Sequence, residues 1–242
     1  MTDGPPAATL RSARTDRRSR RRTRSRVARL QASHSYGRVL AVVLCLFAFA
    51  AIAPDGGWAT GLLALIATAM LVVTAWTSGL VAVGSNAIRL VAIGGCVAAA
   101  ASFLSDGESV TGAVALACGL MVVATIGVIV LGVLDQHEVN AQTVQGAISV
   151  YLLLGLFFVF VYGTVAALGS GPFFAQGVDG TRALRLYFSY VTLATLGYGD
   201  YTPTGNLGHL LAVFEALVGQ LYLVIVLTML VTRLGQRGRP GA

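Results

Sequence analysis

Charged side chains are scarce in this sequence, and lysine is absent altogether. Only 11% of the 242 residues are charged, whereas 56% are hydrophobic, and the mean hydropathy is +0.77. A soluble protein of this length could not remove so much apolar surface from water. The composition therefore excludes an ordinary soluble domain and indicates a protein that lies largely in lipid.

Residues that commonly carry enzymatic or metal chemistry are also few. The three cysteines, Cys45, Cys96 and Cys118, fall in separate apolar runs, where a free thiol packs as a small hydrophobic group. The three histidines are scattered along the chain, and no nucleophile–base pair or metal-ligand spacing is visible. We therefore expect neither an enzyme nor a bound cofactor.

Six apolar runs account for most of the composition. About 17 residues suffice for a helix to cross a hydrocarbon core of ~30 Å, and the first and third runs are close to this minimum. We predict an all-α membrane protein with six transmembrane helices. The runs cover residues 38–53, 58–80, 88–104, 110–134, 145–168 and 207–233.

Arginine accounts for all 17 basic residues, and its distribution predicts the orientation of the chain. If the N-terminus is cytoplasmic, fifteen arginines fall on the inner side and only Arg182 and Arg185 on the outer side. This bias follows the positive-inside rule. We therefore expect a multi-pass protein of the cell membrane with both termini in the cytoplasm.

Eleven of these arginines lie at or before Arg38. Residues 1–37 otherwise contain mainly Ser, Thr, Pro and Ala, which is typical of a disordered tail, and they lack the apolar core of a cleaved signal peptide. We interpret the tail as a topological anchor; the alternative is a polybasic patch for anionic lipid. Nucleic acid is not expected as a partner, because the arginine-rich part has no interleaved aromatic residues.

A polar segment with two glycines separates the last two apolar runs. Residues 182–196, RALRLYFSYVTLATL, predict a half-length helix, and TLATLGYGDYTP (192–203) overlaps its end. Non-helical backbone at membrane depth is tolerated only where it is buried in protein or lines a water-filled path. We therefore predict a re-entrant element, in which a short helix descends from the outer face and an extended strand returns to it.

The spacing of the glycines predicts the conformation of that strand. Gly197 and Gly199 alternate with Leu196 and Tyr198. A strand whose successive carbonyls face one axis must alternate between ordinary and left-handed backbone, which glycine adopts without steric cost. Four such strands would build rings of oxygens that replace the water shell of a cation, with Thr195 adding a hydroxyl at the inner end.

This segment resembles the potassium-channel signature TxxTxGYGD. The matching positions are Thr192, Thr195, Gly197, Tyr198, Gly199 and Asp200. The resemblance implies a homotetramer, with one filter strand per chain and K⁺ as the permeant ion. It places the filter at Thr195, Leu196, Gly197, Tyr198 and Gly199, with K⁺ at the first four of these residues.

Two positions near the filter depart from the commonest pattern of the family. Leu196 stands where valine is usual, and Ala194 stands where threonine is usual. The carbonyl of residue 196 is unaffected by this change, so selectivity is expected to be retained. Val191 replaces a glutamate that braces the filter in some relatives, so inactivation linked to that carboxylate is not expected.

Further residues are expected to support the outer mouth. Tyr187 matches an aromatic position that donates a hydrogen bond to the filter acid in related channels, so we predict a contact between Tyr187 and Asp200. Thr192 belongs to the same support. Asp200, together with Asp179, would make a fourfold mouth negative and concentrate cations there.

Two residues of the last run are candidates for gating. Gly219 lies 19 residues after Asp200, where the family often has a glycine hinge; the alternative is a packing glycine. Glu215 is a costly intramembrane carboxylate. We expect it to pair with a hydroxyl such as that of Ser189 or Tyr190, or to be protonated. It would then serve as a structural brace or as a pH-sensitive gate element.

The plan of four plus two spans resembles the six-span voltage-gated channels, but the sensor chemistry is missing. Residues 111–134 contain no arginine or lysine, and voltage gating requires charge to move, at ~2.3 kcal/mol per charge per 100 mV. We therefore predict a sensor-like domain without gating charges at 38–135. The pore domain follows at 145–235, and the tail at 236–242 is too short for a ligand-binding domain.

These features predict a passive potassium-selective channel that is not strongly voltage-gated. The alternatives are a less selective cation channel and a non-conducting regulatory subunit that co-assembles with another channel. Tyr198 and Gly199 argue against the first alternative, because relaxed filters usually lose one of them. Nothing in the sequence excludes the second.

Overall fold

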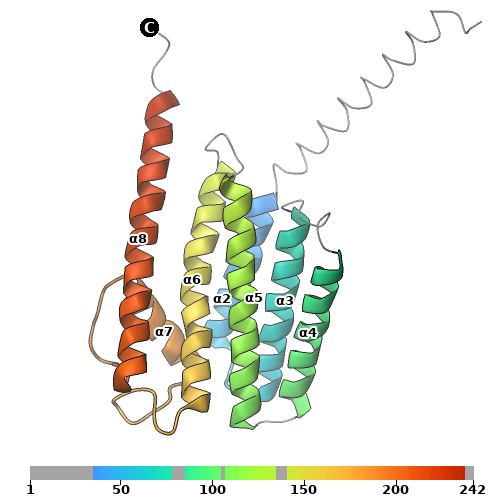
Figure 1. Ribbon diagram of the computed structural model, residues 1–242, viewed down its shortest axis with the longest axis vertical. Helices are drawn as coiled ribbons and strands as arrows, with labels where there is room; N and C mark the ends of the chain where they lie inside the picture. Colours follow the sequence, from blue (N-terminus) through green and yellow to red (C-terminus); the bar gives the residue numbers. More distant parts are fainter. Residues whose placement is uncertain (1–34, 78–84, 105–106, 135–140, 238–242) are drawn as a thin grey trace, which may run out of the picture. The chain divides into compact units, whose positions relative to one another are not determined.

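The computed structural model describes residues 35–77, 85–104, 107–134 and 141–237 (Figure 1). Almost all of the predicted N-terminal tail and most of residues 236–242 lie outside these ranges. Within them the chain is helical, and the only β pairing is two isolated bridges made by Phe174. The predicted all-α class is therefore confirmed for the described part of the chain.

The helices follow the apolar runs of the sequence closely. Their bounds are α2 Ser35–Ile52, α3 Gly57–Thr77, α4 Ser85–Leu104, α5 Glu108–Leu134, α6 Ala141–Leu168, α7 Arg182–Leu193 and α8 Gly205–Arg237. Helix α2 ends just before Pro54, whose ring and missing N–H cannot continue a helix.

Among the described residues, four segments are long and apolar enough to cross a membrane: Gly57–Ala75, Ser109–Val133, Gln142–Leu168 and Gly205–Val226. The other two apolar helices, Tyr36–Ile52 and Leu90–Leu104, are shorter. They correspond to the first and third apolar runs, 38–53 and 88–104, which are close to the minimum length for a transmembrane helix. By length and composition these helices fit a multi-pass membrane protein, and the count of six spans stays a prediction.

The helices pack around one main apolar core. Helix α5 lies along α6, α3 contacts both α4 and α5, and α7 contacts α6 and α8. Fully buried side chains from α2, α3, α5 and α6 form this core, including those of Leu46, Leu63, Val122 and Leu153. Because α7 contacts both α6 and α8, these two helices set the position of the segment that follows α7.

A second, aromatic cluster holds the connection between α6 and α7. Its buried members are Phe158, Tyr162, Phe173, Phe174 and Phe188. The backbone of this connection also pairs with the chain beyond the filter, through Thr204 N to Phe173 O at 2.7 Å and Ala175 N to Thr202 O at 2.8 Å. The chain that follows residues 194–200 is therefore fixed to this buried aromatic cluster.

Candidate functional site

The short helix α7 leads directly into the glycine-containing segment. It begins after Thr181, whose hydroxyl accepts the N–H of Leu184 at 3.1 Å, as expected of a helix N-cap. It ends at Leu193, and the N–H of Leu196 still reaches the carbonyl of Val191 at 2.9 Å. Residues 196–199 have no regular secondary structure, and the re-entrant element stays a prediction.

The backbone of the segment alternates in the way that its glycines predict. Gly197 and Gly199 have φ of 59° and 76°, and Thr195 has φ of 57°. A positive φ is unusual for a β-branched residue and marks strain that the surroundings must hold. The sequence reasoning did not foresee this at Thr195, although the two-residue spacing from Gly197 could have suggested it.

The side chains of this segment are left uncovered by their own chain. All residues from 194 to 200 are exposed, with Leu196 at 56% and Tyr198 at 65%. A contiguous exposed segment with large apolar side chains commonly marks an interaction surface. More than half of the surface of each of these two large residues is therefore left uncovered within the single chain.

Asp200 is held at the outer end of the strand by several groups. Tyr187 Oη donates to Asp200 Oδ2 at 2.7 Å, and Gln176 Nε2 donates to the Asp200 carbonyl at 2.8 Å. The hydrogen bond to Asp200 raises the pKa of Tyr187 to about 12, which keeps the phenol a donor. The rings of Tyr187 and Tyr198 are stacked, with centroids 6.4 Å apart.

Two other residues predicted near the mouth have local roles in the fold. The Asp179 carboxylate accepts the N–H of Phe173 at 2.9 Å, within the connection between α6 and α7. The Thr192 carbonyl accepts the N–H of Thr195 at 2.9 Å, at the start of the strand. Their predicted contributions to ion conduction stay predictions.

Glu215 of α8 is fully buried behind the segment. Ser189 Oγ lies 2.5 Å from its Oε1, and Tyr162 Oη donates to its Oε2. The hydroxyl of Tyr190, considered from the sequence, donates to the Leu152 carbonyl instead. No spacing in the sequence pointed to Tyr162, because its contact with Glu215 joins α6 to α8. Glu215 thus links α6, α7 and α8.

Gly219 lies where α8 crosses the end of α7. A Cβ at this position would overlap the Leu193 carbonyl oxygen and meet the Leu193 side chain. The lack of a side chain at position 219 therefore allows α8 to pack closely against Leu193, the last residue of α7. This is the packing alternative considered from the sequence, and a hinge at Gly219 stays a prediction.

We expect Gly219→Ala to lower the thermal stability of the protein. Overpacking of a well-packed site costs about 1–3 kcal/mol, and the backbone carbonyl of Leu193 cannot move without displacing the filter segment. Thermal unfolding in detergent checks this result. Gly127→Ala is the matched control, because nothing lies within 4 Å of a Cβ there. A stability equal to wild type would contradict the packing requirement.

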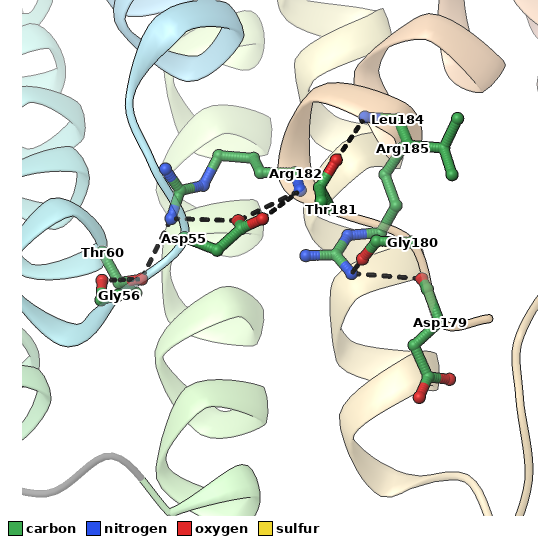
Figure 2. Close-up of polar contacts among 9 residues, drawn as sticks. All are labelled: Asp55, Gly56, Thr60, Asp179, Gly180, Thr181, Arg182, Leu184 and Arg185. Atoms are coloured by element: carbon green, nitrogen blue, oxygen red, sulfur yellow. Dashed lines mark hydrogen bonds and ion pairs between the residues drawn. The ribbon is translucent and has the colours of Figure 1, made fainter.

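A polar cluster at the start of α7 was not predicted from the sequence (Figure 2). Asp55, between α2 and α3, accepts the backbone N–H of Arg182 at 3.1 Å and lies 3.9 Å from its guanidinium. Arg182 Nη2 also donates to Thr60 Oγ1 at 3.1 Å. Burial lowers the pKa of Arg182, and Asp55 opposes that shift. Arg182 is only 7% exposed, although its sequence position suggested an outer loop.

Comparison with known proteins matches this chain to a family and to several curated relatives. A family described as "Ion channel" matches residues 146–236. The inward rectifier potassium channel Kirbac3.1 of Paramagnetospirillum magnetotacticum is 32% identical over 103 residues, covering 42% of this chain and 35% of that protein. Potassium channel subfamily K member 16 of Mus musculus is 33% identical, covering 39% and 33% respectively.

A third relative is matched over most of its length. Protein LctB of Bacillus caldotenax is 31% identical over 98 residues, which cover 38% of this chain and 72% of that protein. The chain spans only about a third of the length of the first two relatives. No solved structure gives a significant match. The family match at 146–236 covers most of α6 and α8 and all of α7, which carry the candidate site.

Proposed function

We propose, from the premise that this chain belongs to the potassium channel family, that it forms a passive K⁺-selective pore from four copies. The observation that carries this proposal is the alternation of left-handed backbone at Thr195, Gly197 and Gly199. Such a strand can direct successive carbonyls toward one axis, where they replace the hydration shell of a cation. Leu196 and Tyr198 then pack away from that axis.

A tetramer follows from the number of strands. Each chain has one filter segment, and one strand cannot surround an ion. The uncovered side chains of Leu196 and Tyr198 support this proposal, because neighbouring copies would bury them. In the proposed tetramer, Thr195, Leu196, Gly197 and Tyr198 provide the K⁺ sites, and Gly199 and Asp200 form the outer end.

The proposed channel is not strongly voltage-gated. Helix α5, Glu108–Leu134, corresponds to the fourth apolar run of the sequence and contains no arginine or lysine. Without an arginine or lysine to move through the field, this helix provides no steep response to membrane potential. A steep conductance–voltage curve would contradict this part of the proposal.

The proposed pore is tested by ion flux into liposomes that contain the purified full-length protein. We expect uptake of K⁺ and Rb⁺ but not Na⁺, together with block by Ba²⁺, because the carbonyl rings match a dehydrated ion of K⁺ size. Protein-free liposomes of the same lipid serve as the control. Equal Na⁺ and K⁺ flux would favour the less selective cation channel, and absence of flux at any voltage would favour the regulatory subunit.

A further inference from the structure

The first turn of α7 is held by the connection between α2 and α3. The two carboxylate oxygens of Asp55 accept the backbone N–H of Arg182, at 3.1 and 3.3 Å. Arg182 is the first residue of α7, so this carboxylate lies at the positive end of the helix, where a negative charge is stabilising. Thr181 accepts the N–H of Leu184 in the same turn. The N-terminus of α7 is thus capped partly by a residue 127 positions earlier in the chain.

The side chain of Arg182 turns back to the same part of the chain (Figure 2). Its Nη2 lies 3.9 Å from Asp55 Oδ1 and donates to Thr60 Oγ1, in the first turn of α3, at 3.1 Å. The Arg182 side chain is only 8% exposed. Removing the Asp55 charge would leave this buried guanidinium without its ion-pair partner, which is costly.

The turn before α7 moves together with the helix. Arg185 Nη1 donates to the backbone carbonyls of Asp179 at 3.3 Å and Gly180 at 2.6 Å, both in that turn (Figure 2). The turn and the first residues of α7 therefore form one hydrogen-bonded unit. Asp55 attaches this unit to the connection between α2 and α3.

Helix α2 contacts α7 at a second place. The rings of Phe47 and Tyr190 meet edge to face, with centroids 5.2 Å apart and an interplanar angle of 88°. Tyr190 lies eight residues after Arg182, or about 12 Å farther along the helix at about 1.5 Å per residue. Its own position is fixed, because its hydroxyl donates to the Leu152 carbonyl and a Cβ at Gly155 would overlap its ring. The α2 side thus contacts α7 near both ends.

The end of α7 is continuous with the proposed filter segment, residues 194–200. Helix α7 ends at Leu193, and the N–H groups of residues 194–196 still donate to carbonyls of α7 at 2.9 to 3.0 Å. The first proposed K⁺ site is at Thr195, inside this hydrogen-bonded turn. A rotation or shift of α7 would therefore displace the first carbonyls of the filter.

We propose that Asp55 and Phe47 are positioning residues for the filter. From the α2 side they hold α7 at two points, and α7 sets where the carbonyls of residues 195–199 lie. This inference rests on the proposed channel function. It assigns to α2 and the turn after it a role that needs no gating charge.

Hydrogen–deuterium exchange of the full-length protein in detergent measures how firmly α7 is held, without ion flux. Asp55→Asn keeps the shape of the side chain and removes its charge, and Phe47→Leu removes the ring contact. We expect amide exchange in residues 182–196 to be about fivefold faster or more in each variant, because a contact that opposes local opening is lost.

Ion flux into liposomes then measures the filter itself. The Rb⁺/K⁺ flux ratio and the Ba²⁺ concentration for half block are compared at equal amounts of inserted protein. We expect each variant to change one of these by about threefold or more, since displaced carbonyls hold each ion size differently. A purely structural role would change the amount of folded protein and leave both quantities as in wild type.

Val122→Ala is the matched control. Val122 is fully buried in the main core on α5, so its truncation lowers stability without removing either contact to α7. We expect a lower unfolding temperature with unchanged exchange in residues 182–196 and an unchanged Rb⁺/K⁺ ratio. A change in the ratio as large as that in Asp55→Asn would overturn the proposal, because general loss of stability would then explain both.

Two further outcomes would overturn the proposal: unchanged exchange in both variants, and faster exchange with an unchanged Rb⁺/K⁺ ratio and Ba²⁺ block. If Asp55→Asn does not fold, Phe47→Leu alone decides, because it replaces one apolar side chain with another at a partly exposed position. Absence of K⁺ flux in wild type contradicts the proposed channel instead. The exchange rates then decide alone whether Asp55 and Phe47 hold α7.

Discussion

Replacing Gly199 with alanine abolishes K⁺ flux through the reconstituted protein while the chain stays folded in the membrane. Gly199 has φ of 76°, and the single chain leaves open space around a Cβ there, so the penalty is conformational. Left-handed backbone costs a non-glycine residue about 1 kcal/mol. In four copies this is about 4 kcal/mol, or about a thousandfold in the population of the conducting strand.

The matched control for this variant is Gly177→Ala. Gly177 also has a positive φ, 80°, and nothing lies within 4 Å of a Cβ there, but it belongs to the connection between α6 and α7. Flux of K⁺ and Na⁺ into liposomes is measured for both variants at equal amounts of inserted protein. Selective K⁺ flux through Gly199→Ala would contradict the proposed filter. An equal loss of K⁺ flux in both variants would show that alanine disturbs folding rather than the filter.

Replacing Glu215 with alanine destabilises the protein by about 3 kcal/mol or more per chain. The change removes the acceptor of Tyr162, takes away a partner of Ser189 and leaves a cavity among α6, α7 and α8. Thermal unfolding and the fraction of assembled protein on size exclusion measure the loss. Tyr162→Phe removes one hydroxyl and keeps the ring, so its effect should be smaller.

The glutamine variant at the same position distinguishes the shape of Glu215 from its charge. Ser189 Oγ lies 2.9 Å from the Gly155 carbonyl, which can only accept, and a serine hydroxyl has one proton to donate. If Ser189 donates its one proton to the Gly155 carbonyl, its hydrogen bond with Glu215 requires a proton on the Glu215 carboxyl group. We expect Glu215→Gln to be nearly as stable as wild type, because its amide can donate to Ser189 and accept from Tyr162. A loss as large as that of Glu215→Ala would show that the negative charge itself is required.

Hydropathy predicted the helices well because each is an uninterrupted apolar run with polar or proline boundaries. Helix α6, Ala141–Leu168, begins four residues before the run at 145, since polar Gln142 and Thr143 fit a helix end as well as a loop. The left-handed backbone at Gly197 and Gly199 was predictable for a local reason: only glycine adopts it without cost. The same reasoning fails for Thr195, because a β-branched residue such as threonine rarely has a positive φ and so does not predict one.

Contacts between distant segments were largely beyond prediction. The sequence named Ser189 as a partner of Glu215, since both lie near the filter, but Tyr162 is 53 residues away from Glu215. The link between Asp55 and Arg182 spans 127 residues and depends on the N-terminal ends of α3 and α7 lying beside each other. Such pairs have no periodic signal in one sequence, because their spacing is set by packing.

The buried hydrogen bonds of Glu215 have a consequence for the order of folding and assembly. Its hydrogen bonds and the aromatic cluster around Phe174 are all completed within one chain, before any second copy is present. The strand from 194 to 200, in contrast, is exposed in that chain. In the proposed tetramer, each subunit would therefore fold its helices and their buried contacts as a monomer. The ion path between the four segments would form only when the last subunit joins.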